Sequence, residues 1–303
     1  GKEEVAREKT ILLADQLRHR DDDEARANEL MLASLYPGHP YSLTRFGLPE
    51  AVKAMTEEKL EEWHNKTIKR QYPMVMLVGD TDGSSLISRI FSEGLKRGEL
   101  DKVLKVNLPP LAGTGQEKTE QRNRALATQI IGFRLGSAMP PQLLSQSVAS
   151  PDDFFSLTML ATLASSGKLN EKLRTELGLV DSLTIKHEPR LASSGFSIRF
   201  ATLPENEAKT REALQAELQK LAAALPADDD FEAGRNATIG RYAIALQSHP
   251  VRAMEYARTV IFGRKPSDVE SQPDSIRSIR KADIKRAAES LKLEGRGVVL
   301  AGK

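Results

Sequence analysis

The chain has 303 residues, which is enough for two domains, and it contains no cysteine, so disulfides and thiolate metal sites are excluded. Its 44 basic and 42 acidic residues are well mixed, the net charge is only +2 and aromatic residues make up 5% of the chain. This composition argues against a dedicated nucleic-acid surface. No apolar run approaches the roughly 20 residues that cross a bilayer, and no signal peptide is visible at Gly1.

Apolar spacing and capping residues predict four helices and one strand in the first third of the chain. We expect the helices over Val5–Leu17, from the acidic run Asp21–Glu24 to Leu35, over Thr56–Ile68 and over Ser84–Leu95. The apolar run Tyr72–Val78 predicts a buried strand. Two prolines and a glycine predict a loop at Tyr36–Tyr41, which reads YPGHPY.

A segment that contains two prolines and two glycines then separates two parts of the chain, and we expect a linker over residues 106–120. Beyond it, strands are expected at Ala125–Leu135, Leu179–His187, Phe196–Leu203 and Val298–Ala301. Helices are expected from Pro151 to Leu163, over Lys168–Leu177, from Asn206 to Leu225, from Asp228 to Leu246, over Val251–Phe262 and over Asp283–Leu291. Strands and helices that are segregated in this way predict an α+β fold, with antiparallel sheets and helices covering one face.

Two blocks of sequence are the most distinctive. The first, Tyr36–Trp63, joins the proline-glycine loop to Gly47 and to a helix that begins Met55-Thr56. The second, Ser166–Val180, reads SGKLNEKLRTELGLV. In their order and spacing, which run through nearly the whole chain, these blocks resemble the pitrilysin/insulinase/mitochondrial processing peptidase family of zinc metallopeptidases. None of the residues quoted is catalytic.

The resemblance implies a domain organisation. Residues 1–105 resemble the second portion of a first peptidase-like α+β domain, and residues 121–303 resemble a complete following domain of the same type. The implied architecture is therefore a two-domain α/β sandwich whose first domain is incomplete.

The chain departs from the family in its zinc motif. Active members carry H-x-x-E-H on a helix, where the two histidines bind zinc and the glutamate is the general base. The five histidines here are His19, His39, His64, His187 and His249, and no two of them are three or four residues apart. We therefore expect no peptidase activity from this chain alone, and zinc to be bound by the complete enzyme or a partner half.

One position of this sequence falls where the family has its third zinc ligand. That position holds Asp15, and aspartate can bind zinc, although its side chain is one methylene shorter than glutamate. Asp15 is either a metal ligand in a longer catalytic chain or an ordinary helix aspartate in a degenerate site.

The resemblance also implies a substrate contact. In several family members the half without zinc ligands touches substrate through an arginine and a tyrosine. The segment Ser193–Phe200 resembles the strand with that arginine, which makes Arg199 the candidate, with Phe196 beside it. A guanidinium can bind a peptide carbonyl, but Arg199 can equally be a solvated strand arginine. Asp181 stands where the family often has a tyrosine, which weakens any claim of contact there.

Two functions remain open. The chain is either the non-catalytic part of a zinc endopeptidase, forming chamber wall and binding unfolded peptide beside a catalytic half, or a catalytically inactive assembly subunit of a larger complex. We expect a soluble protein of the bacterial periplasm or cytoplasm, with no nucleic-acid partner and no membrane span.

Overall fold

The computed structural model describes residues 1–68, 74–93, 117–135, 153–291 and 295–301. In the first part of the chain the helices are α1 (Lys2–Asp21), α2 (Asp23–Leu35), the 3-10 turn η1 (Pro40–Ser42), α3 (Pro49–Lys53), α4 (Glu57–Trp63), the π-helical turn η2 (His64–Ile68) and α5 (Gly83–Glu93). The strands of the second part are β1 (Lys118–Arg122), β2 (Ala127–Arg134), β3 (Ser182–Glu188), β4 (Gly195–Thr202) and β5 (Gly295–Ala301).

The helical segments of the second part are α6 (Asp153–Ser166), α7 (Lys168–Asn170), the π-helical turn η4 (Glu171–Glu176), η5 (Pro204–Asn206), α8 (Glu207–Ala223), α9 (Asp228–Ala245), α10 (His249–Ile261), η6 (Pro266–Val269), α11 (Gln272–Arg277) and α12 (Lys281–Glu289). Local sequence explains their ends. The side chain of Thr56 accepts a hydrogen bond from the backbone N–H of Lys59 and caps α4, and Gly178, with φ of +58°, ends the turn after α7 as its sequence predicts.

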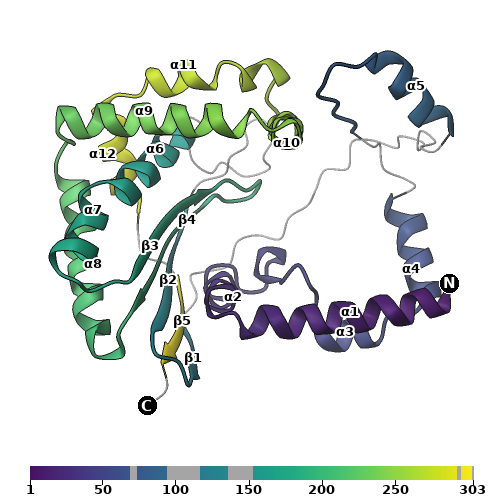
Figure 1. Cartoon of the computed structure of the whole chain (residues 1–303), viewed down its shortest axis with the longest axis horizontal. Coiled ribbons are helices and arrows are strands. Elements are labelled where there is room, and N and C mark those ends of the chain that lie inside the picture. Colours follow the sequence, from purple (N-terminus) through teal and green to yellow (C-terminus); the bar gives the residue numbers. More distant parts are fainter. Residues whose placement is uncertain (69–73, 94–116, 136–152, 292–294, 302–303) are drawn as a thin grey trace.

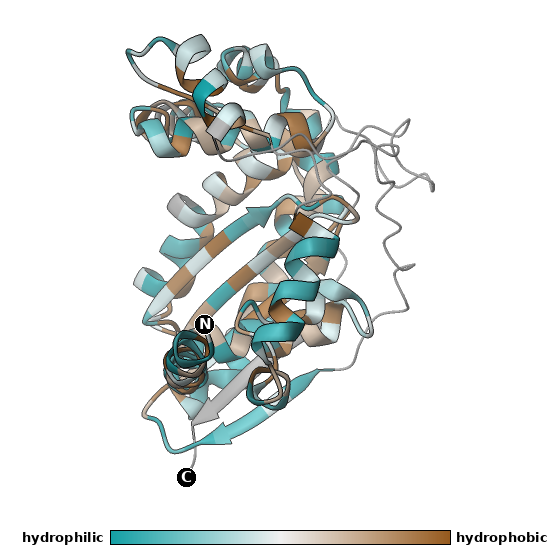
Figure 2. Ribbon diagram, turned by 90° about the vertical axis from the view of Figure 1, so that its right-hand side faces the viewer, coloured by the Kyte–Doolittle hydropathy of each residue, from teal (hydrophilic) through white to brown (hydrophobic). Residues whose placement is uncertain are grey.

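The strands form one five-stranded sheet in the order β1-β5-β2-β4-β3 (Figure 1). The pairs β5–β2, β2–β4 and β4–β3 are antiparallel, as expected, whereas β1 pairs with β5 in parallel. Hydrophobic and hydrophilic residues alternate along the long strands (Figure 2), because successive side chains of a strand point to opposite faces. An α+β fold is confirmed.

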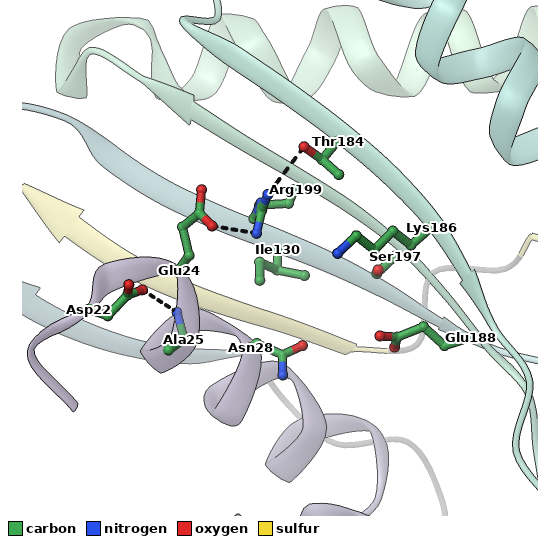
Figure 3. Close-up of a pocket in the computed structure, with 10 residues that line it drawn as sticks. All are labelled: Asp22, Glu24, Ala25, Asn28, Ile130, Thr184, Lys186, Glu188, Ser197 and Arg199. Carbon is green, nitrogen blue, oxygen red and sulfur yellow. Dashed lines mark hydrogen bonds and ion pairs between the residues drawn. The ribbon is translucent and has the colours of Figure 1, made fainter. Parts of the chain in front are cut away.

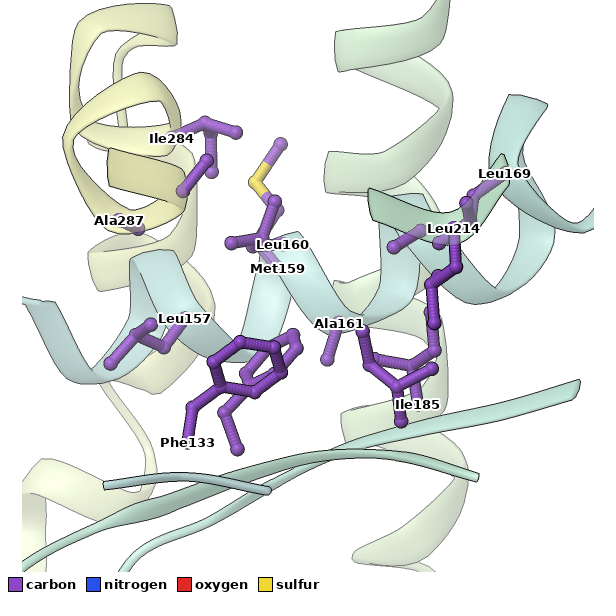
Figure 4. Packing of buried hydrophobic residues seen from close by; sticks show 14 of the residues in the cluster. Phe133, Leu157, Met159, Leu160, Ala161, Leu169, Ile185, Leu214, Ile284 and Ala287 are labelled. Carbon is purple, nitrogen blue, oxygen red and sulfur yellow. The ribbon is translucent and has the colours of Figure 1, made fainter. Parts of the chain in front are cut away.

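The main hydrophobic core lies between one face of this sheet and the helices α6, α8, α9 and α12 (Figures 1 and 4). Phe196, Ile198 and Phe200 enter it from β4, and Leu160 of α6 and Leu214 of α8 meet them from the helices. All five side chains are buried, and burial of one such side chain contributes about 1.5–3 kcal/mol to folding.

The helices of the second part of the chain cover one face of the sheet, and a helix from the first part packs on the other face. Helix α2 packs on the opposite face, over β2, where Met31 and Leu35 meet Ile130 in a second, smaller core. Gly132 permits this approach, because a Cβ at that position would lie 2.5 Å from Leu35 Cδ1 and 2.6 Å from Met31 Sδ. Side chains from the first part of the chain therefore pack directly on the sheet of the second part.

The predicted buried strand Tyr72–Val78 is not found in its described portion, residues 74–78, which pair with no strand in the described chain. Met74 and Leu77 are partly exposed there, so an apolar run alone does not define a strand without a neighbour to pair with. Most of the predicted linker lies outside the described residues, and its last residues from Lys118 belong to β1. The division into two domains stays a prediction.

Candidate functional site

A polar pocket of about 320 Å³ lies between the first turns of α2 and the sheet face that α2 leaves uncovered (Figure 3). Residues from four elements line it. They are Asp22, Glu24, Ala25 and Asn28 at the start of α2, Ile130 on β2, and Thr184, Lys186, Glu188, Ser197 and Arg199 on β3 and β4.

Strand alternation explains why these residues face the pocket. On β4, Phe196, Ile198 and Phe200 point into the main core, so Ser197 and Arg199 point to the opposite face. The antiparallel register places Thr184 of β3 directly opposite Arg199, and Arg199 Nη2 donates a hydrogen bond of 3.2 Å to Thr184 Oγ1. The sheet thus fixes the backbone position of Arg199 and the direction of one N–H donor of its guanidinium.

The other contact of Arg199 is with α2. Its Nη1 lies 2.5 Å from Glu24 Oε2, and the Glu24 side chain is 52% exposed whereas that of Arg199 is 28% exposed. Ion pairs with such an exposed partner are worth about 0–1 kcal/mol, because water and salt compete for both charges. A ligand oxygen can therefore replace the Glu24 carboxylate at little cost.

The rest of the pocket offers both hydrogen-bond donors and hydrogen-bond acceptors. Asp22 caps α2 by accepting from the Ala25 backbone N–H at 2.8 Å, and Glu188 is held by Arg190 at 2.9 Å. Lys186 is exposed and makes no hydrogen bond or ion pair within the described residues. Such a set of donors and acceptors fits a polar ligand, whereas none of these residues is arranged as a nucleophile with a base.

Phe196 is not part of this pocket. Its side chain is 1% exposed and lies in the main core, where its ring meets that of Phe133 at 6.1 Å. The structure therefore separates Phe196 from Arg199 and places them on opposite faces of β4. We do not carry Phe196 into the proposed site.

Asp15 lies on α1 and forms an ion pair with Arg18 one turn later. Within the part of the chain that the structure describes, no group of three or more histidine, aspartate or glutamate side chains is gathered so that it could hold a metal ion. The described residues therefore do not fit a zinc ion, and a role of Asp15 as a ligand stays a prediction. The Asp181 side chain is exposed at the start of β3, and its backbone N–H donates to the Ala201 carbonyl at 2.9 Å.

The block YPGHPY has a structural role that sequence reasoning missed. The Tyr41 hydroxyl accepts a 3.0 Å hydrogen bond from the Ala192 backbone N–H, and the Arg190 guanidinium lies 5.5 Å and 5.8 Å from the ring centres of Tyr36 and Tyr41. This loop therefore holds the turn between β3 and β4, which carries one end of the pocket. In the sequence, Tyr36 and Tyr41 were the one signal of a contact between this loop and another part of the chain.

Comparison with known proteins identifies the family of the chain and the fold that it shares with solved structures. Residues 54–238 match the family model described as the peptidase M16 inactive domain. An uncharacterized zinc protease of Mycobacterium tuberculosis is 20% identical over 308 residues, and the match covers 99% of this chain and 67% of that protein. The chain thus spans about two thirds of the length of this curated relative.

Solved structures share the fold. The peptidase M16 inactive domain from Pseudomonas fluorescens superposes with a TM-score of 0.81 at 16% identity, over 100% of this chain and 72% of that chain. A chain of Complex III2 from Candida albicans superposes with a TM-score of 0.74 at 13% identity, over 96% of this chain and 70% of that chain. At these identities the likeness shows the fold alone.

No helix in the described ranges combines the length and the apolar character needed to cross a membrane. The resemblance to the family of zinc peptidases, drawn above from the sequence, is confirmed by the family match. Since that match covers more than half of its residues, the chain belongs to the family of peptidase M16 inactive domains.

Proposed function

We propose that this chain is the non-catalytic portion of a zinc-dependent endopeptidase, and that the pocket between α2 and the strands β3 and β4 binds an extended stretch of an unfolded peptide. A catalytic half, fused or separate, supplies the zinc and the general base. We assign no step of the zinc chemistry to this chain, because its described residues do not fit the metal. Its part is to form chamber wall and to hold substrate.

The observation that supports this proposal most directly is the placement of Arg199. The sheet orients its guanidinium through Thr184, and its one ion pair within the described residues is with the exposed carboxylate of Glu24. A peptide carbonyl that replaces Glu24 accepts a charge-assisted hydrogen bond, which is roughly twice as strong as a neutral one. The guanidinium then fixes the position of the peptide backbone without reading its side chains.

The test measures hydrolysis of a fluorescence-quenched peptide by the complete enzyme, that is, this chain together with its catalytic half. Arg199→Ala should lower kcat/KM by about 10–100-fold, because a hydrogen bond from a charged group is lost. Glu24→Gln should raise the affinity for peptide a few-fold, because it removes the competing carboxylate. Arg211→Ala is the matched control, since Arg211 pairs with Glu207 on α8 away from the pocket.

If kcat/KM of Arg199→Ala equals that of the wild type, the pocket around Arg199 does not bind the peptide substrate. The purified chain alone should not cleave peptide, and cleavage that survives chelation would contradict the proposed division of labour.

A second function is supported by one comparison. A chain of similar fold comes from Complex III2 of Candida albicans, so this fold also occurs in a larger complex. The chain would then be a catalytically inactive assembly subunit. In that case the complex with its partner shows no peptide hydrolysis, and Arg199→Ala has no turnover to change.

A further inference from the structure

A second cavity, of about 350 Å³, lies on the helix side of the sheet near the end of β3, where α6, α9, α10 and α11 come together (Figure 1). It is separate from the peptide pocket in character, because aromatic rings form much of its wall. The side chains that matter for its chemistry are Phe154, Phe155, His187, Arg241, Tyr242 and Arg258.

The aromatic wall comes from the first turn of α6. The rings of Phe154 and Phe155 lie 4.9 Å apart at 79°, and the ring of His187 lies 5.4 Å from that of Phe154. The Arg264 guanidinium lies 5.1 Å from the centre of the Phe154 ring. Such a wall offers favourable contact to a flat or branched apolar group.

Two arginines provide positive charge at the same cavity. Arg241 of α9 is exposed and makes no hydrogen bond or ion pair within the described residues. Arg258 of α10 uses Nη2 to bind Glu255, at 2.5 Å and 2.6 Å, which leaves its Nη1 and Nε donors available. Glu255 therefore pairs with one of these two charges, whereas Arg241 has no ion-pair partner among the described residues.

The third feature is an unpaired acceptor on His187. Thr158 Oγ1 donates its single proton to the Phe154 carbonyl at 3.0 Å, so it accepts from His187 Nδ1–H, also at 3.0 Å. His187 Nε2 is then an acceptor, and it is buried with no hydrogen-bond partner in the part of the chain that the structure describes. Burial, with a smaller effect of the Arg258 charge, lowers the pKa of His187 to about 4, so the ring is neutral at pH 7.

We propose that this cavity binds a small monocarboxylic acid with an apolar body, whose carboxylate is held by Arg241 and Arg258 while its body packs on Phe154 and Phe155. An O–H or N–H group next to the carboxylate would pair with His187 Nε2. Two sources share this chemistry, namely a free carboxylic acid and the C-terminal residue of a peptide. Arg199 does not line this cavity, although Lys186 lines both this cavity and the pocket around Arg199.

The experiment measures binding to the full chain by calorimetry and ligand-observed NMR. The probes are 3-phenylpropionate and its amide, and an acetylated peptide that ends in phenylalanine with either a free or an amidated C-terminus. Each acid should bind at least about tenfold more tightly than its amide, because only the acid can pair with arginine. This comparison needs no variant and so does not depend on how a substitution folds.

Variants then locate the site. The double substitution Arg241→Gln and Arg258→Gln should weaken binding of the acid by at least about tenfold. Arg252→Gln is the matched control, because Arg252 is exposed on the same helix α10 but does not line the cavity, and it should bind as the wild type does.

Preference for 3-phenylpropionate over the peptide would indicate a small-molecule site, and preference for the peptide would indicate capture of a chain end. Equal binding of acid and amide, or undiminished binding by the folded double variant, would overturn the proposal. The effect of Arg199→Ala on peptide hydrolysis tests the pocket around Arg199, and it does not test this cavity.

Discussion

His187 shows how far one side chain can depart from its behaviour in water. Its ring is enclosed by Phe154 and Thr158 and faces the positive charge of Arg258. Burial, and then Arg258, lowers its pKa from 6.5 to about 4, since both disfavour the imidazolium. In the unfolded chain the same ring takes up a proton near pH 6.5.

This difference makes stability depend on pH in a definite direction. Above pH 6.5 the ring is neutral in both states, whereas between pH 6.5 and 4 only the unfolded state takes up the proton, so the folded state loses stability as the pH falls. The loss approaches about 3 kcal/mol at pH 4. His187→Phe should remove it, so urea unfolding from pH 8 to pH 4 should show a variant with a flatter profile. Parallel profiles of wild type and variant would contradict the assignment.

At the candidate site, the direction of Arg199 could be predicted from sequence and its partners could not. Apolar residues at Phe196, Ile198 and Phe200 place these side chains on the core face and Arg199 on the other, so alternation alone argues against grouping Phe196 with Arg199. The contacts with Thr184 and Glu24 depend on strand register and on the packing of α2. Neither follows from local pattern.

At the scale of elements, the contact between α6 and α9 depends on one glycine. A Cβ at Gly234 of α9 would overlap Leu163 Cδ2 of α6 and would lie 2.5 Å from Leu163 Cγ. Gly240, later in the same helix, has no atom within 4 Å of the position that a Cβ would take. The two glycines therefore carry the same cost in helix propensity, but only Gly234 is needed for packing.

The pair provides its own control. Gly240→Ala should raise the free energy of unfolding by about 0.5–1 kcal/mol, because alanine loses less conformational freedom in a helix. Gly234→Ala has the same gain but an overpacking cost of about 1–3 kcal/mol, so a net loss is expected. Denaturant unfolding of both variants measures the difference. A Gly234→Ala protein that is as stable as Gly240→Ala would show that α6 and α9 adjust without strain.

Elements with strong local signals were predictable. The capped helix α4 and the antiparallel pair β3–β4 lie within a few residues of their predicted positions. Strand β1 was not predicted, because its sequence KTEQR is polar and its strand conformation comes from pairing with β5 far along the chain. Residues 74–78 show the converse, an apolar run that forms no strand within the described residues.

At the scale of the whole molecule, an ionic network joins the corner between α1 and α2 to β1. Arg122 binds Asp23 at 3.0 Å and Glu120 at 2.8 Å, and it also donates to the backbone carbonyls of Arg20 and Asp21. The sequence interpretation of Asp21–Glu24 as a cap holds for Asp22, which accepts from Ala25. Asp21 and Asp23 instead bind arginines about a hundred residues away, which no local pattern reveals.

This network predicts an unequal effect of two neighbouring arginines. The Arg122 side chain is 14% exposed and donates to two carboxylates and two backbone carbonyls, so Arg122→Gln removes several charge-assisted hydrogen bonds at once and should cost about 2–3 kcal/mol. Arg124 also binds Asp21 and Asp23, but it is 38% exposed, and Arg124→Gln should cost less than about 1 kcal/mol.

Urea unfolding gives both values, and limited proteolysis near Asp21–Asp23 should be faster only in Arg122→Gln. Equal and small effects would mean that the apolar contact of α2 with β2 holds the corner by itself. A large effect of Arg122→Gln without faster proteolysis would mean that the lost stability is spread over the whole sheet. The expected result instead means that the partly buried guanidinium of Arg122 on β1 stabilises the junction between α2 and the sheet. The first turn of α2 also borders the pocket around Arg199.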